Sequence, residues 1–524
     1  MSDTQTSSGF GKLKSALVEL ASLARRYEGR AAILGKGPSF DEFEPNGRHS
    51  GRFIVGLNET ALQIRCHASF IIDEDILQRA GTEIAATPDL YLITPRVPHG
   101  VISNIGGLTI YGARRSTAAT APWAENFSRR HLAFNLSTSE SDPALGPMIT
   151  AGNFSAPIVA ELLAIAGFTD ILLAGVDGGT AYSSGFKDVE YKKLRSVQDN
   201  FDSQFEELRH LRDRYKVTFR SARCEEAFVL IGTEAEQCLA TEVLKWSIDA
   251  NTFLNVQYVD GTTFTSSMFG EGKSGTPFSF QRIFLPEAAG HKGRGIYFDS
   301  DMLVFKDVFR LFNSDMQGHV LLGCEPTPGR PKQYSMFLVD NERATWNGCD
   351  LLKDYSAGRV SYDSLLKDFC FAHAKASSLP MAWNSLEIFE PGITANIHFT
   401  DMGTQPWLSS FNPNASLWCE ALFKALEERP SVALALETSL AQGWVRPSLR
   451  WQVDSGRADP WNMPAFVKAL DRAWLPPHVR LRNTAGASRL QHLRWTLASR
   501  VRRAMQSRRY VRLVRAGRAL RKVF

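Results

Sequence analysis

The fold is decided by the stretch Gly295-Ile-Tyr-Phe-Asp-Ser-Asp-Met-Leu-Val-Phe305. An apolar strand run ends there in Asp299 and Asp301, and a second apolar run follows at once. Carboxylates placed where a buried strand meets solvent are costly unless something uses them. Two oxygen ligands at i and i+2 on a kinked strand end could share one hard divalent cation, Mg²⁺ or Mn²⁺. The alternative is that Asp299-Ser300-Asp301 is a solvated loop, which is the commoner origin of an isolated Asp-x-Asp.

The composition predicts a globular protein of several domains. The chain has 524 residues, of which 44% are hydrophobic and 22% charged, as in soluble proteins of two or three domains. No apolar run approaches the eighteen residues of a transmembrane helix, and the first nine residues lack the regions of a secretory signal. The seven cysteines form no Cys-x-x-Cys pair, so we expect reduced thiols in a cytoplasmic protein.

The chain order predicts an α/β fold with two Rossmann-like nucleotide-binding domains, because strand runs alternate with helical runs and several strands end in polar residues. We expect an N-terminal segment and helix over residues 1–27 and a first domain over 28–223. A second domain would cover 224–470, and a basic helical tail 471–524. Ligand crevices would lie at the carboxyl ends of the strands.

In the first domain a short strand runs into Gly35-Lys-Gly-Pro-Ser39. Glycines let a backbone approach a ligand closely, and exposed amides there could hold a phosphate. A plain tight turn is the alternative. Together with Asn58, the strand end at Asp73 and Leu173-Ala-Gly-Val-Asp177, this loop resembles bacterial family 42 sialyltransferases and the related domain shared with archaeal hydroxymethylpterin diphosphokinases.

This first resemblance covers about residues 28–190 and implies nucleotide binding. Lys36 stands where the sialyltransferases usually have asparagine, and no catalytic histidine can be placed. The implied nucleotide-binding residues are Gly35, Gly37, Ser39, Asn58 and Asp177.

In the second domain His398 ends another strand, in Ile397-His398-Phe399. An isolated strand histidine is more often a core residue than a ligand. Together with Asp299 and Asp301 it would supply two carboxylates and one imidazole, a set that suits Mn²⁺ better than Mg²⁺. Three protein ligands would leave open positions for two phosphate oxygens.

Residues 226–410 resemble family 8 glycosyltransferases, the glycogenin and lipopolysaccharide galactosyltransferase type, with a GT-A fold. Six matches follow the order of the family, which is more specific than any one of them. They are Ile231-Gly-Thr233, Arg282-Ile-Phe-Leu-Pro286, Gly295-Ile-Tyr-Phe-Asp-Ser-Asp-Met-Leu-Val304, Tyr334-Ser-Met-Phe-Leu-Val-Asp340, Leu379-Pro-Met-Ala-Trp-Asn384 and His398-Phe-Thr-Asp-Met-Gly-Thr-Gln-Pro-Trp407.

The resemblance implies roles for these positions. Asp299, Asp301 and His398 would hold Mn²⁺ (or Mg²⁺), while Arg282 and Asn384 would lie near the reacting sugar as catalytic residues. The implied nucleotide-sugar contacts are Ile231, Gly232, Thr233, Asp299, Ser300, Asp301, Thr400, Gln405 and Trp407.

Two positions depart from the family. Gln405 replaces a lysine that touches the phosphates, so the metal and Arg282 would carry more of the leaving-group charge. The family's Asp-Gln-Asp segment is Ser361-Tyr-Asp363 here, which leaves Asp363 as the catalytic candidate on the reacting face.

The implied reaction moves a hexose from a UDP-sugar to a glycan or lipid-linked hydroxyl with retention of configuration, by front-face displacement. The expected setting is surface polysaccharide or lipopolysaccharide biosynthesis. Two alternatives concern the N-terminal domain: a second transferase that uses a CMP-activated acidic sugar, or a non-catalytic binding or scaffold module. A third is that both domains are degenerate and the chain is a carbohydrate-binding or assembly protein.

The tail is strongly basic. Residues 472–524 contain fourteen Arg, one Lys and no Asp or Glu, so the net charge of +5 leaves residues 1–471 at −10. Apolar residues recur every three or four positions over 489–522, which predicts a basic amphipathic helix on an anionic membrane. Docking on the acidic body and binding of nucleic acid are the alternatives. We expect a peripheral protein on the inner face of the cell membrane, with no nucleic-acid partner.

Overall fold

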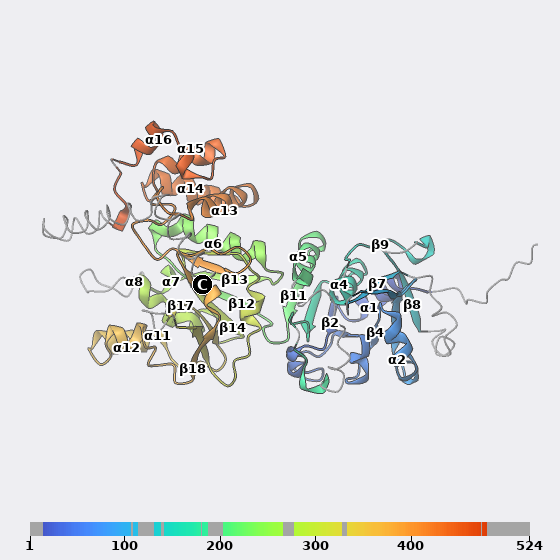
Figure 1. The fold of residues 1–524 in the computed structure, drawn as a ribbon. Coiled ribbons are helices and arrows are strands. Elements are labelled where there is room, and N and C mark those ends of the chain that lie inside the picture. Colours follow the sequence, from blue (N-terminus) through green and yellow to red (C-terminus); the bar gives the residue numbers. More distant parts are fainter. Residues whose placement is uncertain are drawn as a thin grey trace, which may run out of the picture. The chain divides into compact units, whose positions relative to one another are not determined.

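The computed structural model describes residues 14–105, 108–113, 130–137, 141–152, 154–179, 181–186, 203–265, 277–326, 333–472 and 474–478. It divides into two compact units (Figure 1). Unit 1 comprises residues 1–226 and 252–255, and unit 2 comprises 227–251 and 256–524. Both are α/β, which confirms the predicted fold class; the helical tail predicted over 471–524 lies almost wholly outside the described residues. Within the described ranges, no helix is long and apolar enough to cross a membrane.

Unit 1 is built on a parallel sheet of short apolar strands, in the order β1-β8-β5-β4-β3-β2-β10-β11, with β9 paired to β8. Residues 31–34 are fully buried, as expected for a parallel sheet covered on both faces. The strands are β1 (Lys14–Ser15), β2 (Arg30–Leu34), β3 (Phe53–Leu57), β4 (Ala68–Phe70), β5 (Tyr91–Pro95), β8 (His131–Leu136), β9 (Met148–Ile149), β10 (Asp170–Ala174) and β11 (Thr218–Ser221).

Helices and one hairpin complete unit 1. Helix α4 is apolar on nearly every side and buried along most of its length, whereas α2 buries one face only. The elements are α1 (Ala16–Arg26), α2 (Glu74–Ala86), α4 (Ser155–Ile165), α5 (Ser203–Tyr215), the 3-10 turns η1 (Pro38–Glu42), η2 (Asn58–Leu62) and η4 (Pro143–Leu145), and the hairpin β6 (His99–Ile105) with β7 (Leu108–Ala113).

The strand order of unit 1 reverses direction between β2 and β10. From β2 the chain proceeds through β3, β4 and β5 on one side, and β10 and β11 lie on the other side. In doubly wound sheets a ligand crevice forms at the carboxyl ends of the strands at such a switch point. Here the two ends are the loops that begin at Gly35 and Gly175.

Unit 2 has a six-stranded mixed sheet and a separate three-stranded sheet. The larger sheet runs β13-β12-β14-β17-β16-β18, with β12 and β13 parallel to β14 and with β17 antiparallel to both β14 and β16. Its strands are β12 (Ala227–Gly232), β13 (Val256–Asp260), β14 (Arg294–Asp299), β16 (Leu321–Cys324), β17 (Gln333–Asp340) and β18 (Lys375–Leu379). The smaller sheet runs β15-β20-β19, from β15 (Met302–Val304), β19 (Ser385–Leu386) and β20 (Asn396–His398).

A helical layer covers the smaller sheet. Trp407, Trp418 and residues of α6 form one apolar cluster with Leu303 and Ile397 of that sheet, and Figure 1 shows α13 and α14 beside α6. The helices and turns are η6 (Ala235–Gln237), α6 (Cys238–Asn251), α7 (Thr262–Thr265), α8 (Pro277–Phe280), η7 (Gln281–Phe284), α9 (Leu285–Ala288), α10 (Phe309–Phe312), α11 (Gly348–Ser356), α12 (Tyr362–Leu366), η8 (Met381–Asn384), α13 (Ala415–Glu428), α14 (Pro430–Ala441), α15 (Ser448–Ser455), η9 (Pro460–Asn462) and α16 (Ala465–Leu470).

Candidate functional site

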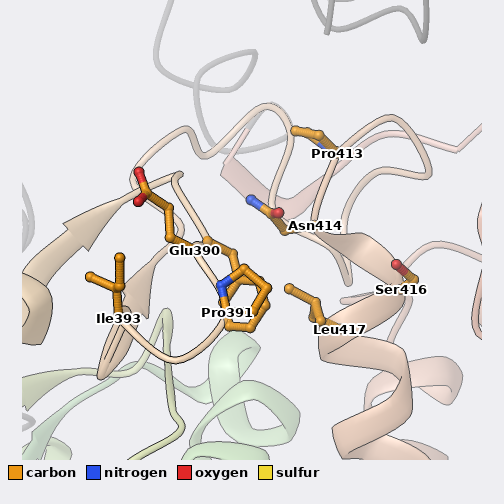
Figure 2. Close-up of a pocket in the computed structure, with 8 residues that line it drawn as sticks. Glu390, Pro391, Ile393, Pro413, Asn414, Ser416 and Leu417 are labelled. Carbon is orange, nitrogen blue, oxygen red and sulfur yellow. The ribbon is translucent and has the colours of Figure 1, made fainter. Parts of the chain in front are cut away.

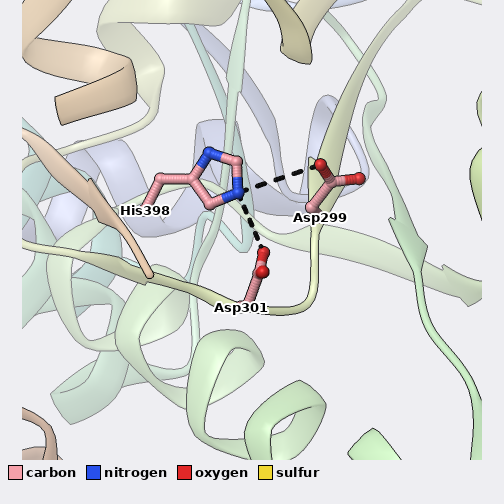
Figure 3. A group of neighbouring side chains, drawn as sticks. All are labelled: Asp299, Asp301 and His398. Carbon is pink, nitrogen blue, oxygen red and sulfur yellow. Dashed lines mark ion pairs between the residues drawn. The ribbon is translucent and has the colours of Figure 1, made fainter. Parts of the chain in front are cut away.

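The turn from Asp299 to Asp301 joins the two sheets of unit 2. Strand β14 ends at Asp299, and β15 begins at Met302 in register with His398 of β20. Two backbone hydrogen bonds fix the turn: the Ser300 amide donates to the Gly232 carbonyl (2.9 Å), and the Phe399 amide donates to the Asp301 carbonyl (2.8 Å). Because of this register, the side chains of Asp299, Asp301 and His398 converge (Figure 3).

The three side chains form a compact cluster with the geometry of a metal site. One ligand atom from each lies within 4.8 Å of the other two. His398 Nε2 is 3.1 Å from Asp301 Oδ1 and 4.0 Å from Asp299 Oδ2. Asp299 and His398 are buried, and the Asp301 side chain is only 13% exposed. Two carboxylates held this close in a buried site repel each other unless a cation compensates them.

Asn384 sets the orientation of His398. Its Oδ1 lies 2.9 Å from His398 Nδ1, so the Nδ1 proton is donated to the amide oxygen and Nε2 faces the two aspartates. Metal-bound histidines are held in this way by a second hydrogen bond. Burial lowers the pKa of His398, but the carboxylates of Asp301, Asp299 and Glu387 outweigh it and leave the pKa raised.

Asp299 is held at one oxygen and open at the other. Its Oδ1 accepts from the Tyr297 hydroxyl (2.7 Å) and from Arg282 Nη2 (3.3 Å), while Oδ2 faces His398. Burial raises the pKa of Asp299, with the Arg282 guanidinium opposing the shift and Asp301 adding to it. The ionised form needs more positive charge than Arg282 alone provides.

Asp301 shows where that charge would bind. Gln405 Nε2 donates to Asp301 Oδ2 (2.9 Å) and to the Phe399 carbonyl (3.1 Å). The other oxygen, Oδ1, is buried and has no hydrogen-bond partner among the described residues, and neither has Ser300 Oγ. A buried carboxylate oxygen that has only an imidazole nitrogen beside it suits a divalent cation. The donor set therefore fits Mn²⁺ or Mg²⁺.

Residues 231–233 are shaped by a glutamine that sequence reasoning missed. Gln281 Oε1 accepts from the Thr233 amide (2.8 Å), and its Nε2 donates to the Thr233 carbonyl (2.9 Å). Ile231 is fully buried, so only backbone at this strand end can face a ligand, and the Gly232 carbonyl already accepts from Ser300. The clamp spans 48 residues, and no local pattern marks it.

The other expected site residues differ in their positions relative to the Asp-Asp-His cluster. Arg282 lies against the cluster, bonded to Asp299 and to the Tyr334 carbonyl, and Thr400 is half-buried. Trp407 is buried in the apolar core, 5.3 Å from Trp418 by ring centroids. Asp363 is exposed on α12 and pairs with Lys367 at 2.7 Å. No contact recorded among the described residues joins Asp363 to the cluster, so its catalytic role stays a prediction.

A second residue that sequence reasoning missed, Arg446, holds the backbone directly after Gln405. It is fully buried, and its Nε donates to the Pro406 carbonyl (3.0 Å) while its amide donates to the Trp407 carbonyl (2.9 Å). Its Nη atoms donate to Ser448 Oγ and Gln452 Oε1. Burial lowers the pKa of Arg446. The only sequence signal is one arginine in an apolar surrounding.

A cavity of about 640 Å³ lies along the chain that leads to His398 (Figure 2). Asn414 also donates to the Glu387 carbonyl (2.9 Å), and Glu387 Oε1 accepts from the Asp401 amide (3.0 Å). The cavity wall is thus bonded to the loop that follows His398. Its lining combines apolar rings with polar tips: Phe389, Glu390, Pro391, Ile393, Pro413, Asn414, Ser416 and Leu417.

In unit 1 the predicted nucleotide-binding residues mostly contact one another. Asp177 accepts from the Ser39 amide (2.7 Å) and from Ser39 Oγ, and that Oγ accepts from the Gly175 amide (2.7 Å). A Cβ on Gly35 would lie 2.2 Å from the Gly175 carbonyl oxygen, and one on Gly37 would lie 2.4 Å from Asp177. Asn58 is left-handed, with φ 56°, and its Oδ1 is buried without a hydrogen-bond partner among the described residues.

Comparison with known families now adds an activity. Residues 203–349 match the model described as glycosyl transferase family 8. The chain resembles family 8 glycosyltransferases. The match supports glycosyltransferase activity for this region, as the sequence predicted. The matched residues include Arg282, Asp299 and Asp301, and they end before Asn384 and His398.

Several solved glycosyltransferases overlap with the chain in part. GlyE of Streptococcus pneumoniae TIGR4 is 16% identical with a TM-score of 0.29, covering 42% of this chain, which spans 64% of the length of GlyE. The galactosyltransferase LgtC, solved with donor and acceptor sugar analogues, is 14% identical with a TM-score of 0.26, covering 37% of this chain and 94% of LgtC. WbbM, described as a bifunctional glycosyltransferase, is 11% identical with a TM-score of 0.30, covering 78% of this chain and 99% of WbbM. No curated protein matches the chain. The resemblance to glycosyltransferases therefore rests on the family match over residues 203–349.

Proposed function

We propose that unit 2 is a metal-dependent, retaining hexosyltransferase that uses a UDP-sugar. The observation that carries the proposal is the buried Asp-Asp-His cluster, in which Asp301 Oδ1 makes no hydrogen bond among the described residues and lies 3.1 Å from His398 Nε2. Asp299, Asp301 and His398 would hold Mn²⁺ or Mg²⁺. Bound there, the cation would act as a Lewis acid that neutralises charge on the departing UDP.

The surrounding residues orient the ligands and add charge. Tyr297 and Arg282 direct Asp299, Asn384 directs His398, and Gln405 directs Asp301. Since Gln405 is neutral and bonded to Asp301, Arg282 is the cationic side chain bonded within the cluster. Its guanidinium, beside the donor phosphates, would stabilise the leaving group.

The proposed step is a displacement on one face of the sugar. The bond between the anomeric carbon and the phosphate oxygen breaks, and the acceptor oxygen bonds to the same carbon on the same face. The acceptor proton passes to the departing phosphate oxygen. A trapped covalent sugar on a side chain of this protein would contradict the step.

We place the acceptor, a glycan or a lipid-linked sugar, at the cavity in Figure 2. Apolar rings with a few polar tips are the usual lining of a small-molecule site, and here Glu390, Asn414 and Ser416 supply the polar tips. The setting would be surface polysaccharide or lipopolysaccharide synthesis at the inner face of the cell membrane, with the basic tail on anionic lipid. Co-sedimentation with anionic vesicles tests the last point: equal binding by the full chain and a chain ending at 471 would contradict it.

The test of the main proposal is UDP-sugar hydrolysis by the full chain with Mn²⁺. Asp301→Ala should lower turnover by more than about 100-fold. Loss of a hydrogen-bond partner of a metal ligand costs about 10- to 100-fold, and loss of the ligand itself should cost more. Asp350→Asn is the matched control, since Asp350 is an exposed carboxylate on α11 paired with Lys353. Turnover that is unaffected by Asp301→Ala would reject the proposal.

A second proposal concerns unit 1, whose switch point between β2 and β10 favours a nucleotide site of its own. Its Gly35 loop and Asn58 lie at carboxyl ends of neighbouring strands. This unit would transfer an acidic sugar from a CMP donor, or bind nucleotide without catalysis. CMP release by an Asp301→Ala chain would favour the first version.

A further inference from the structure

Glu387, directly after β19, is bonded both to the strand of His398 and to the wall of the cavity in unit 2. Its φ is 58°, in the left-handed region that is disfavoured for a residue with a side chain. Such a backbone persists only where the surrounding contacts enforce it, and it is commonest at functional sites. Two hydrogen bonds of the Glu387 backbone and two of its carboxylate supply those contacts.

On the donor side, Glu387 holds the loop that carries Gln405. The Glu387 amide donates to the His398 carbonyl (3.1 Å), and Glu387 Oε1 accepts from the Asp401 amide (3.0 Å). The Asp401 carbonyl in turn accepts from the Gln405 amide (3.1 Å). Gln405 Nε2 donates to Asp301 Oδ2 (2.9 Å). A series of hydrogen bonds therefore leads from the Glu387 carboxylate to a predicted metal ligand.

On the cavity side, the same residue holds two asparagines. Glu387 Oε2 accepts from Asn412 Nδ2 (3.2 Å), and the Glu387 carbonyl accepts from Asn414 Nδ2 (2.9 Å). Asn412 Oδ1 accepts from the Asn414 amide (2.8 Å), which closes a ring of three residues. Both asparagines are buried, and Asn414 lines the cavity in Figure 2.

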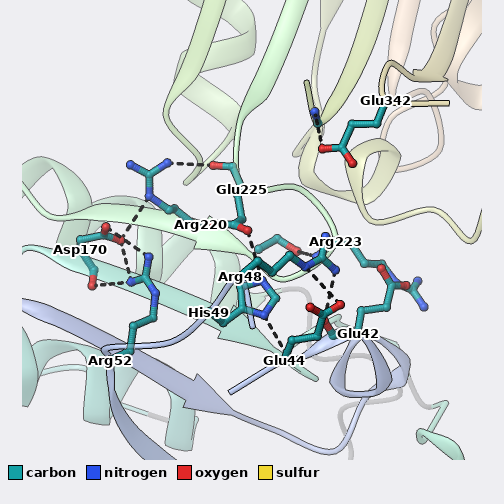
Figure 4. Close-up of polar contacts among 12 residues, drawn as sticks. Glu42, Glu44, Arg48, His49, Arg52, Asp170, Arg220, Arg223, Glu225 and Glu342 are labelled. Atoms are coloured by element: carbon teal, nitrogen blue, oxygen red, sulfur yellow. Dashed lines mark hydrogen bonds and ion pairs between the residues drawn. The ribbon is translucent and has the colours of Figure 1, made fainter. Parts of the chain in front are cut away.

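The Glu387 carboxylate differs from the paired carboxylates of unit 1. Asp170 there accepts from Arg52 (3.0 Å) and from Arg220 (3.2 Å), as Figure 4 shows. Among the residues that the structure describes, Glu387 makes no ion pair, and its oxygens accept from a backbone amide and from an asparagine. Because both donors are neutral, a glutamine at this position would keep the shape of the side chain and change only the pattern of hydrogen bonds.

We propose that Glu387 is a positioning residue that holds the donor loop (residues 401–405) and the cavity wall at Asn414 as one unit. This deepens the function proposed for unit 2 and rests on it. Asp301 then keeps its hydrogen bond from the donor loop while the acceptor lies against Asn414. Displacement of the Glu387 carboxylate should therefore weaken metal binding, although Glu387 itself lies outside the Asp-Asp-His cluster.

The test is Mn²⁺ binding by the full chain with excess UDP, measured from the electron paramagnetic resonance signal of unbound Mn²⁺. Mn²⁺ bound by the Asp301→Ala chain is subtracted, which removes other sites. Glu387→Gln sets a new amide donor against the donor of Asp401 or of Asn412, so the dissociation constant of Mn²⁺ should rise at least about 5-fold. An unchanged dissociation constant would overturn the proposal.

Glu161→Gln is the matched control. Glu161 is a fully buried carboxylate of unit 1 that accepts from the amides of Thr150 and Ala151 (both 2.7 Å). Its replacement should lower the midpoint of thermal unfolding and leave Mn²⁺ binding unchanged. An equal loss of Mn²⁺ binding in the two variants would reduce Glu387 to a residue of the fold and overturn the proposal.

A reversed pair tests the geometry directly. In the chain with both Glu387→Gln and Asn412→Asp, the introduced amide donates to the introduced carboxylate, and the net charge equals that of the unmutated chain. Asn412→Asp alone sets two carboxylates face to face and should give the weakest binding. We expect the double variant to bind Mn²⁺ more tightly than the Glu387→Gln chain. Binding that is no tighter would overturn the proposal.

Asn414→Ala tests the link to the cavity wall. It removes a donor to the Glu387 carbonyl, so the dissociation constant of Mn²⁺ should rise about 2-fold or more. The assay contains no acceptor, so a residue that only contacts the acceptor would have no effect, and that result would overturn the link. Absence of Mn²⁺ binding by the unmutated chain would reject this proposal and that for unit 2, whereas binding without UDP-sugar turnover would reject the transferase alone.

Discussion

The two units place ionisable groups at strand ends in opposite ways. Unit 2 gathers two carboxylates and an imidazole, and Asp301 Oδ1 makes no hydrogen bond among the described residues. Unit 1 gathers two cations around Glu59 and holds Asp73 beside them. The first arrangement lacks positive charge and suits a metal cation, whereas in the second Lys36 and Arg79 are already paired with Glu59 and Asp75. The same part of an α/β fold can thus hold an uncompensated set of charges or a compensated one.

Removal of metal should separate the two sites most strongly. With excess EDTA we expect UDP-sugar turnover to fall by more than about 100-fold, since the aspartates lose the charge that pairs them. The thermal unfolding of unit 1 should not change, because Lys36 and Arg79 pair with Glu59 within the protein and need no metal. A turnover assay and thermal unfolding on one preparation check both, and EDTA-resistant turnover would contradict the comparison.

The next largest effect is expected from loss of the hydrogen bond between Asn384 and His398. Asn384→Leu removes the acceptor of the Nδ1 proton, and loss of such a partner costs about 10- to 100-fold in metal affinity or activity. The measurement is the Mn²⁺ concentration that gives half-maximal turnover. Asn462→Leu, at a surface turn on η9, is the control; equal effects of the two variants would reject the assignment.

Arg446→Met tests whether the hydrogen bonds of Arg446 hold the loop that carries Gln405 in position. The Pro406 carbonyl and Gln452 would lose their donor inside the core, at a cost of roughly 2–4 kcal/mol. Thermal unfolding should show a lower midpoint, and the Mn²⁺ requirement should rise because Gln405 loses its fixed position. A lower midpoint with an unchanged Mn²⁺ requirement would reduce Arg446 to a residue of the fold alone.

The smallest expected effect is a contrast of pH dependence within unit 1. Burial opposes the pairing of Glu59 with Lys36 and Arg79, but the pairing prevails and lowers the pKa of Glu59 to about 2. Its stabilising contribution is therefore present above about pH 4.5 and lost as the pH falls toward 2. Asp73 has a pKa raised to about 7, so its contribution is present below about pH 4 and lost as the pH rises through 7.

Asp73→Asn should accordingly gain stability over the unmutated chain as the pH rises from 4 to 7, on the order of 1 kcal/mol. The thermal unfolding midpoint of both chains across this range measures the gain. A constant difference between the two midpoints would show that Asp73 titrates normally.

The metal-ligand candidates of unit 2 could be predicted from the sequence. The residues that hold the surrounding loops could not, because their partners are distant along the chain. Asp299, Asp301 and His398 are ligand types at strand ends, which a sequence displays. Gln281 and Arg446 act across 48 and 40 residues, and no periodicity encodes such pairs. Gln281 itself lies in η7, between the short helices α8 and α9, and not in one continuous helix. Pro286 has no amide hydrogen to continue a helix.

In unit 1 the sequence predicted the position of the Gly35–Ser39 loop, but it did not predict which residues the loop contacts. Glycines and Ser39 resemble a phosphate cradle, but Gly35 faces the Gly175 backbone and Ser39 bonds Asp177. Because β2 and β10 are 140 residues apart at their first residues, nothing local to either strand shows that their loops interlock. Lys36 and Glu59, an unremarked pair in the sequence, meet only because β2 and β3 are neighbours.

The bonds of Arg446 continue toward the end of the described chain. Ser448, which accepts from Arg446, donates through its Oγ and its amide to Asp471 (2.6 and 3.0 Å). Asp471 directly precedes the arginine-rich segment. A chain of hydrogen bonds thus connects Asp471 through Ser448 and Arg446 to the Pro406 carbonyl, next to Gln405. A truncation that keeps Asp471 preserves this anchor point, and one that ends at residue 470 releases it.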